Sequence, residues 1–150
     1  MSSQAQVKHG SSVEENVALM RKWFDDVWNH GDFQIVRDRM AQHAVGQGQN
    51  DRSEPLTGPD EFIAFATRIR AAFPDIRLKV EDIFGAGDRV AVRWTAVMTH
   101  TGHGLDIAPT NLPVQTNGIT IVQIVNGAVA AGWDCWDQAG MMQQLTAKAG

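Results

Sequence analysis

The chain has 150 residues, a formal net charge of −4 at pH 7 and a hydrophobic fraction of 43%. We expect a single domain over residues 12–146 with short tails at 1–11 and 147–150, since this length suits one core. The acidic balance and the lack of a Lys/Arg cluster argue against nucleic acid as a partner. No apolar run approaches the roughly 18 residues of a membrane span, and no signal-peptide pattern opens the chain, so we predict a cytoplasmic protein without a membrane partner.

The first part of the chain predicts helices. Ser12 and Glu15 fit a capping box, and apolar residues follow at helical spacing until Gly31, which predicts a long amphipathic helix. Asp32 can cap a short second helix that includes Met40. These helices come before any clear strand signal.

A brief, irregular strand is expected near residues 45–49, where Gly and Gln alternate after Val45. Pro59 is placed for the first turn of a third helix, with acidic residues beside its positive end. Apolar residues then recur on one face until Pro74 ends the helix. The sequence therefore predicts three helices in its first half.

The second half has a period of two, which predicts strands. The expected strands begin with the alternation at Ile76 and then cover residues 89–100, 114–125 and 128–137. The last two are joined by Asn126-Gly127, a strong hairpin signal. Helices followed by an antiparallel meander predict an α+β fold in which the helices cover one face of the sheet. A strongly curved sheet would leave a pocket beneath them.

Several motifs in the second half resemble the SnoaL-like polyketide cyclases in order and spacing. The most specific are Thr99-His100-Thr101-Gly102, Ala108-Pro109-Thr110, Trp133-Asp134-Cys135-Trp136-Asp137 and Met142-Gln143-Gln144-Leu145. The resemblance spans about residues 13–145. It implies the NTF2-like fold, which is a cone-shaped, curved antiparallel sheet with covering helices and an internal cavity.

The resemblance also implies a function. The best-known members are cofactor-independent cyclases that use an aspartate as acid/base in an aldol reaction, so the expected ligand is a small hydrophobic, carbonyl-containing molecule of polyketide type. Fold alone does not choose among the reactions of this superfamily. A noncatalytic domain that binds a small hydrophobic ligand, or a hydrolase or isomerase on the same fold, stays open. Sites built on tyrosine hydroxyls are excluded, because the chain has no tyrosine.

Asp134 is the predicted catalytic residue. The resemblance places the cyclase aspartate in the last strand, shortly after the Asn-Gly turn, where Asp134 stands. Strand periodicity puts it on one face with Gly132 and Trp136, and a carboxyl group beside an indole in a pocket should have a raised pKa. The alternative is an aspartate that caps the strand end or pairs with a surface arginine.

Three further polar residues are candidates for the site. His100 could hydrogen-bond an acidic partner or a substrate oxygen, or could be a structural histidine at the strand end. Arg93 could stabilise an enolate if its strand face lines the cavity, or form a surface ion pair if that face points outward. Gln47 could bind a substrate carbonyl, or only be solvated in an irregular strand.

The remaining candidates concern the walls of the predicted cavity. Thr120 stands where some family cyclases carry a cavity histidine, and Trp136 and Trp28 could contact the ligand or only belong to the core. His100 and His103 have no third ligand at suitable spacing, so we predict no metal site. The single cysteine, Cys135, is interpreted as a small buried hydrophobe.

A homodimer is also predicted. The outer face of the sheet would carry Ile119, Ile121 and Val125 in alternation, and such an apolar surface is expected to be covered.

Overall fold

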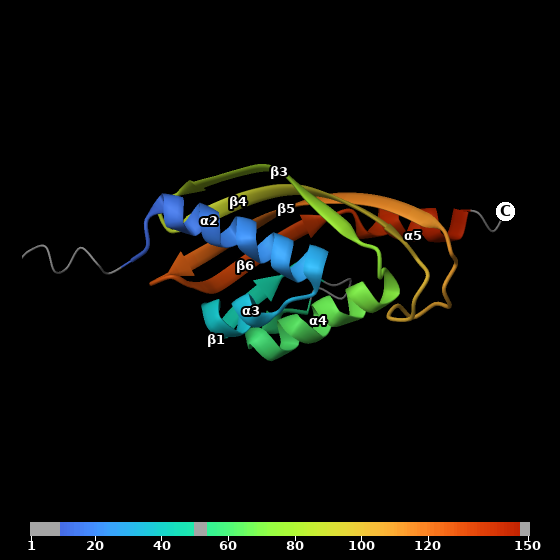
Figure 1. The fold of residues 1–150 in the computed structure, drawn as a ribbon, viewed down its shortest axis with the longest axis horizontal. Coiled ribbons are helices and arrows are strands. Elements are labelled where there is room, and N and C mark those ends of the chain that lie inside the picture. Colours follow the sequence, from blue (N-terminus) through green and yellow to red (C-terminus); the bar gives the residue numbers. More distant parts are fainter. Residues whose placement is uncertain (1–9, 50–53, 148–150) are drawn as a thin grey trace, which may run out of the picture.

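The computed structural model describes residues 10–49 and 54–147, which form one curved sheet and the helices packed against it (Figure 1). The predicted tails at 1–11 and 147–150 lie mostly outside these ranges. The strands are β1 (Met40–Gln47), β2 (Leu56–Thr57), β3 (Arg77–Ala86), β4 (Arg89–Thr99), β5 (Pro113–Val125) and β6 (Ala128–Trp136). The helices are α2 (Val13–Phe24), the π-helix η2 (Asp25–His30), α3 (Gln34–Arg39), α4 (Gly58–Ala72) and α5 (Gln138–Ala147). The α+β class is therefore confirmed.

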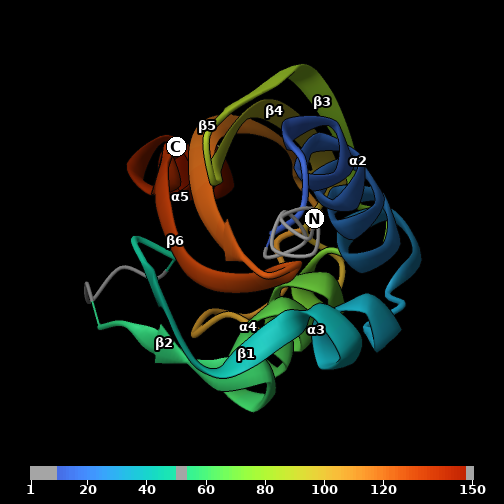
Figure 2. The ribbon, with the colours of Figure 1, turned by 90° about the vertical axis from the view of Figure 1, so that its left-hand side faces the viewer.

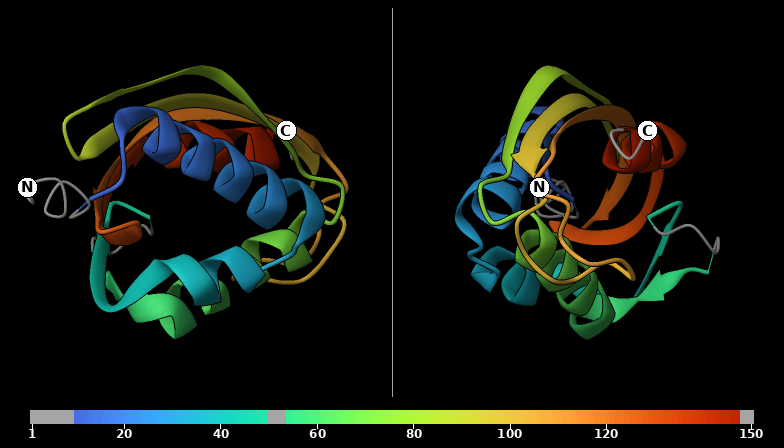
Figure 3. Two further views of the ribbon diagram at one scale, coloured as in Figure 1. Left: turned by 60° about the vertical axis from the view of Figure 1, so that its left-hand side comes forward. Right: turned by 90° about the vertical axis from the view of Figure 1, so that its right-hand side faces the viewer.

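The strands follow the order β2-β1-β6-β5-β4-β3. All neighbours are antiparallel except β1 and β6, which run parallel. The sheet curls around the interior, and α2 packs on β3 while α4 packs on β1, so the helices close its concave side (Figure 2). Views from two other directions show the same curled sheet, with α2 and α4 across its open side (Figure 3). None of the described helices is long and apolar enough to cross a membrane.

The start of the first helix is as predicted, and the end of the second is not. Ser12 Oγ accepts a hydrogen bond from Glu15 N at 3.0 Å, and Glu15 Oε1 accepts one from Ser12 N at 2.8 Å, which completes the capping box. The chain leaves the π-helix at Gly31 with a φ of 66°. The prediction that Met40 belongs to the second helix is wrong: α3 ends at Arg39, and Met40 is extended and opens β1. Apolar spacing alone does not separate a last helical turn from a following buried strand.

Proline and glycine mark the other boundaries as expected. Pro59 lies in the first turn of α4, and the helix ends at Ala72, two residues before Pro74. Asn126 and Gly127 have φ values of 51° and 79°, the left-handed conformation that a tight hairpin turn of this kind requires. The turn sets the first pairs of the β5-β6 hairpin, and a shift in register between Gln123 and Ile124 changes the pairing beyond them.

Helix α5 is an element that the sequence did not predict. Asp137 Oδ1 accepts a hydrogen bond from Gly140 N at 2.9 Å, so this aspartate bonds a backbone amide of the turn that follows β6. The turn continues as a helix, and Met141 and Leu145, four residues apart, are buried. A glycine in the first turn and few apolar positions hide this helix from a periodicity argument.

Candidate functional site

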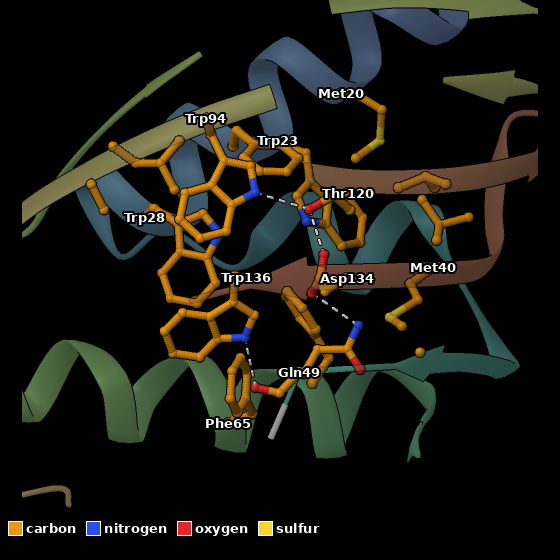
Figure 4. A pocket seen from close by; sticks show the side chains of 18 of the residues that line it. Met20, Trp23, Trp28, Met40, Gln49, Phe65, Trp94, Thr120, Asp134 and Trp136 are labelled. Atoms are coloured by element: carbon orange, nitrogen blue, oxygen red, sulfur yellow. Dashed lines mark hydrogen bonds between the residues drawn. The ribbon is translucent and has the colours of Figure 1, made fainter. Parts of the chain in front are cut away.

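A pocket of about 110 Å³ lies between the concave face of the sheet and helices α2 and α4 (Figure 4). Strand alternation builds its sheet wall, because the even-numbered residues of β5 from 114 to 124 are buried and face inward. Most of the lining is apolar, and aromatic side chains form much of it: Trp23, Trp28, Phe62, Phe65, Trp94 and Trp136. Among the residues that the structure describes, the lining includes no lysine, arginine or histidine, and Asp134 is its one ionisable side chain.

Asp134 reaches this pocket from β6, in register with Thr120 on β5. Thr120 Oγ1 donates a hydrogen bond to Asp134 Oδ1, and Gln49 Nε2 donates one to Oδ2 at 3.0 Å. One carboxylate oxygen is thus bonded by a donor from β5 and the other by a donor from the segment after β1 (Figure 4). The carboxyl group has a fixed orientation before any ligand arrives.

The direction of the hydrogen bond from Thr120 is set by Trp94. The indole Nε1 of Trp94 donates to Thr120 Oγ1 at 3.0 Å, so the hydroxyl proton of the threonine is directed to Asp134. Donors on both oxygens favour the ionised form of the aspartate. The chain from Trp94 through Thr120 to Asp134 therefore suits a carboxylate that acts as a base.

Burial disfavours the ionised form of Asp134, and its effect on the pKa is larger than that of the two hydrogen bonds. It raises the pKa of Asp134 from 3.8 to about 6, although the hydrogen bonds from Thr120 and Gln49 lower it. The part of this side chain that is not covered by protein faces the hollow, since Asp134 is a lining residue. A pKa near 6 places the group in the range that is useful for proton transfer at neutral pH.

Gln49 is the site residue that sequence reasoning missed. It follows Gly48, which has a φ of 85° and lies so close to Asp134 that an added Cβ would be 1.9 Å from the backbone oxygen of Asp134. The backbone oxygen of Gln49 accepts hydrogen bonds from Trp136 Nε1 at 3.2 Å and Gln138 Nε2 at 2.9 Å, which tie this segment to the end of β6 and the start of α5. Gly48, directly after β1, is the sequence feature that could have indicated this turn towards β6, because glycine readily adopts a positive φ.

Four of the sequence-predicted residues lie in the pocket: Asp134, Thr120, Trp136 and Trp28. Asp134 shares its face of β6 with Gly132 and Trp136, as strand periodicity required. Their roles in binding and catalysis stay predictions.

Three predicted residues lie elsewhere, and their proposed roles in the site are corrected here. Arg93 points to the outer face, where its Nη2 pairs with Asp82 Oδ2 at 2.7 Å, because strand alternation directs it away from its buried neighbours. Gln47 is exposed, since the same alternation at the end of β1 turns it outward. His100 is buried outside the pocket lining, and its Nδ1 accepts a hydrogen bond from Thr110 N at 3.2 Å.

His100 instead anchors the loop between β4 and β5. Its ring packs on Phe73 with centroids 5.4 Å apart, and burial lowers its pKa. The interpretation of Cys135 as a buried hydrophobe is also wrong, because it lies exposed on the face of β6 opposite to Asp134. Within the described ranges, no group of three or more His, Cys, Asp or Glu residues is placed to hold a metal ion.

The fold and site define an NTF2-like domain whose apolar pocket has one acidic group among its described lining residues. A family model described as SnoaL-like polyketide cyclase matches residues 18–145, and the chain belongs to this family. A sequence comparison with curated proteins gives no significant match.

Solved structures agree on the fold. A candidate SnoaL-like polyketide cyclase from Jannaschia sp. CCS1 is similar with a TM-score of 0.82 and 23% identity, covering 91% of this chain and 96% of that chain. IdmH from Streptomyces antibioticus, described as a candidate polyketide cyclase, has a TM-score of 0.73 and 26% identity, with 87% and 97% covered. TsrD from Streptomyces laurentii has a TM-score of 0.78 and 23% identity, with 91% and 98% covered.

Proposed function

We propose that this protein is a cofactor-independent acid/base enzyme in which Asp134 removes a proton from the carbon next to a carbonyl group. The observation that carries the proposal is a single carboxyl group, with a pKa of about 6, at the wall of an apolar pocket. At pH 7 a group with this pKa is ionised in about ten molecules for each protonated one. Most molecules at this pH therefore carry the ionised carboxylate, and its pKa is high enough for it to act as a base.

The proposed reaction needs no cofactor, because the proton that Asp134 takes from the substrate is returned to the product. Asp134 takes the proton from the substrate carbon, and the electron pair of that C–H bond forms the enolate. In an aldol-type cyclisation the enolate carbon then bonds to a second carbonyl carbon of the same molecule. The resulting alkoxide takes the proton back from Asp134, so the enzyme returns to its starting state. Holding both carbonyl groups in one small pocket lowers the entropic cost of ring closure.

Trp28 and Trp23 are our proposed donors to the enolate oxygen. Both line the pocket, and neither indole N–H donates a hydrogen bond to another described residue. The indoles of Trp94 and Trp136 already donate to Thr120 Oγ1 and to the backbone oxygen of Gln49. An indole N–H at the pocket wall that has no acceptor in the protein can donate to charge that develops on the substrate.

The proposal is tested by hydrogen exchange at the carbon next to a carbonyl group. The assay follows loss of that C–H signal by NMR for a neutral cyclic ketone in D₂O, with wild-type protein, Asp134→Asn and Asp82→Asn. Asp82 is a matched control, because it is an exposed carboxylate on the outer side of the sheet. We expect Asp134→Asn to lower the catalysed exchange at least about 100-fold, the usual scale for a positioned base, and Asp82→Asn to leave it unchanged.

The same assay separates the enzyme from a noncatalytic binding domain. Equal exchange with wild-type protein and Asp134→Asn would remove the carboxylate from the mechanism. Saturable ligand binding without any catalysed exchange would favour the noncatalytic alternative.

We also propose a homodimer that covers the outer sheet face. Ile119, Ile121 and Val97 on this face are 49%, 38% and 47% exposed, which is high for large apolar side chains. Light scattering over a concentration series should give the mass of a dimer for the wild type and a monomer for Ile121→Lys. A concentration-independent monomer of the wild type would contradict the dimer.

A further inference from the structure

Asp134 has two hydrogen bonds but no charged partner. Thr120 Oγ1 and Gln49 Nε2 donate to its two oxygens, and both donors are neutral. The described lining residues that α2, α4 and the strands contribute include no other titratable or charged side chain. An ionised carboxylate in apolar surroundings is costly without a counter-ion, because neutral donors replace only part of its hydration. The pocket therefore has a negative charge that none of its described lining residues neutralises.

The carboxylate of Asp134 can accept further hydrogen bonds. Each of its oxygens has two lone pairs and receives one donor from the protein, so acceptor capacity is left on both. Asp134 is partly exposed and lines the pocket, and Figure 4 shows its carboxyl group among the other lining side chains. A ligand in the pocket can therefore bond this carboxylate without displacing Thr120 or Gln49.

The walls of the pocket are favourable for a cation. Trp136 lies two residues after Asp134 on the same face of β6, and Trp94 is joined to the carboxylate through Thr120. Further aromatic rings line the pocket from the helices: Trp23, Trp28, Phe62 and Phe65. The faces of aromatic rings attract cations, most strongly those of tryptophan and where water is excluded. A positively charged group near Asp134 would gain from these rings as well as from the carboxylate.

The charge of a ligand decides how well it matches this lining. An anion would lose its hydration, meet no lysine or arginine among the described lining residues, and face the like charge of Asp134. A neutral ligand leaves the charge of Asp134 without a counter-ion. A protonated amine supplies both the missing positive charge and N–H donors, which form strong, charge-assisted hydrogen bonds with a carboxylate.

We propose that the pocket also binds apolar molecules that carry a protonated amine, with the ammonium group paired with Asp134 and the apolar part against the aromatic walls. This inference goes beyond the proposed function, since it assigns a second class of ligand to the pocket and does not need Asp134 to act as a base. A bound ammonium group occupies the carboxylate, so such an amine should inhibit any hydrogen exchange that Asp134 catalyses.

Titration with three probes of similar size and shape tests the inference. Butylamine is positively charged between pH 5 and pH 8, butan-1-ol is neutral, and butanoate is negatively charged. Binding is followed by NMR at the indole N–H signals, because four tryptophans line the pocket. At pH 8 we expect butylamine to bind at least tenfold more tightly than butan-1-ol, and butanoate to bind more weakly than either. Only the ionised carboxylate pairs with the amine, so the advantage of butylamine should fall about tenfold from pH 8 to pH 5.

Two variants locate the interaction. Asp134→Asn should remove the advantage of butylamine at both pH values. Asp82→Asn, which changes an exposed carboxylate on the outer side of the sheet, should leave it unchanged. If Asp134→Asn does not fold, the pH series on the wild type still gives the answer.

The inference would be overturned if butylamine shows no saturable binding, or binds no more tightly than butan-1-ol at pH 8. It would also be overturned by an advantage of butylamine that Asp134→Asn retains, or that is equal at pH 8 and pH 5. Butylamine binding that depends on Asp134, without any catalysed hydrogen exchange, would support the inference and refute the proposed function. Catalysed exchange that depends on Asp134, without butylamine binding, would do the reverse.

Discussion

Replacing Asp134 with asparagine should stabilise the protein above pH 6. The pKa of this carboxyl group rises from 3.8 to about 6 because burial penalises its charged form. For an acid whose folded-state pKa is raised, the stabilising contribution is fully present below pH 3.8 and is lost as the pH rises through 6. At 1.36 kcal/mol per pKa unit, the ionised group costs the fold about 3 kcal/mol at pH 8.

Urea unfolding of wild-type protein and Asp134→Asn at several pH values measures this cost. At pH 4 the wild-type side chain is a neutral acid of nearly the same shape as asparagine, so the two proteins should differ little. The difference should grow in favour of the variant as the pH rises to 8, by up to about 3 kcal/mol. Asp82→Asn, which changes an exposed carboxylate, should show no such trend. A difference between Asp134→Asn and wild type that is the same at pH 4 and pH 8 would refute the reasoning.

Three further substitutions probe the surroundings of Asp134. Thr120→Val removes a donor to the carboxylate, so the pH midpoint of hydrogen exchange should move upward from about 6, and an unchanged midpoint would show that the threonine does not support the ionised form. Gly48→Ala should lower the free energy of unfolding by about 2 kcal/mol or more in a urea titration, because of its φ of 85° and the contact with Asp134; stability equal to wild type would contradict this strain. Arg93→Gln breaks an exposed ion pair, so the free energy of unfolding should change by no more than about 1 kcal/mol and the exchange rate should stay that of the wild type; a loss of exchange would show that Arg93 takes part in the reaction.

Sequence patterns predicted elements best where a local physical rule applies. The capping box of Ser12 and Glu15 and the turn at Asn126-Gly127 are fixed by nearby backbone geometry, so the helix start and the hairpin could be read directly. The placement of Asp134 beside Trp136 followed from strand alternation once the last strand was identified.

The inward or outward direction of a strand face is not a local property. Arg93 was correctly grouped with its alternating neighbours, but only the packing of α2 and α4 decides which face of the sheet is concave. Gln47 and Gln49 are chemically identical and two residues apart, and the left-handed turn at Gly48 brings only the second to Asp134. The hydrogen bond from Trp94 to Thr120 joins residues 26 apart in sequence and depends on the register of β4 and β5.

The pKa of Asp134 tests the central claim most directly, and it needs no substrate. A titration of protein with ¹³C-labelled aspartate carboxyl groups, followed by NMR, gives one curve for each aspartate, and the signal missing from Asp134→Asn identifies the one of interest. We predict a midpoint near pH 6 for this carboxyl group, because the protein covers most of it at the wall of the pocket. A midpoint near 3.8 would show a solvated carboxylate and would contradict the account of Asp134 as a base tuned by burial.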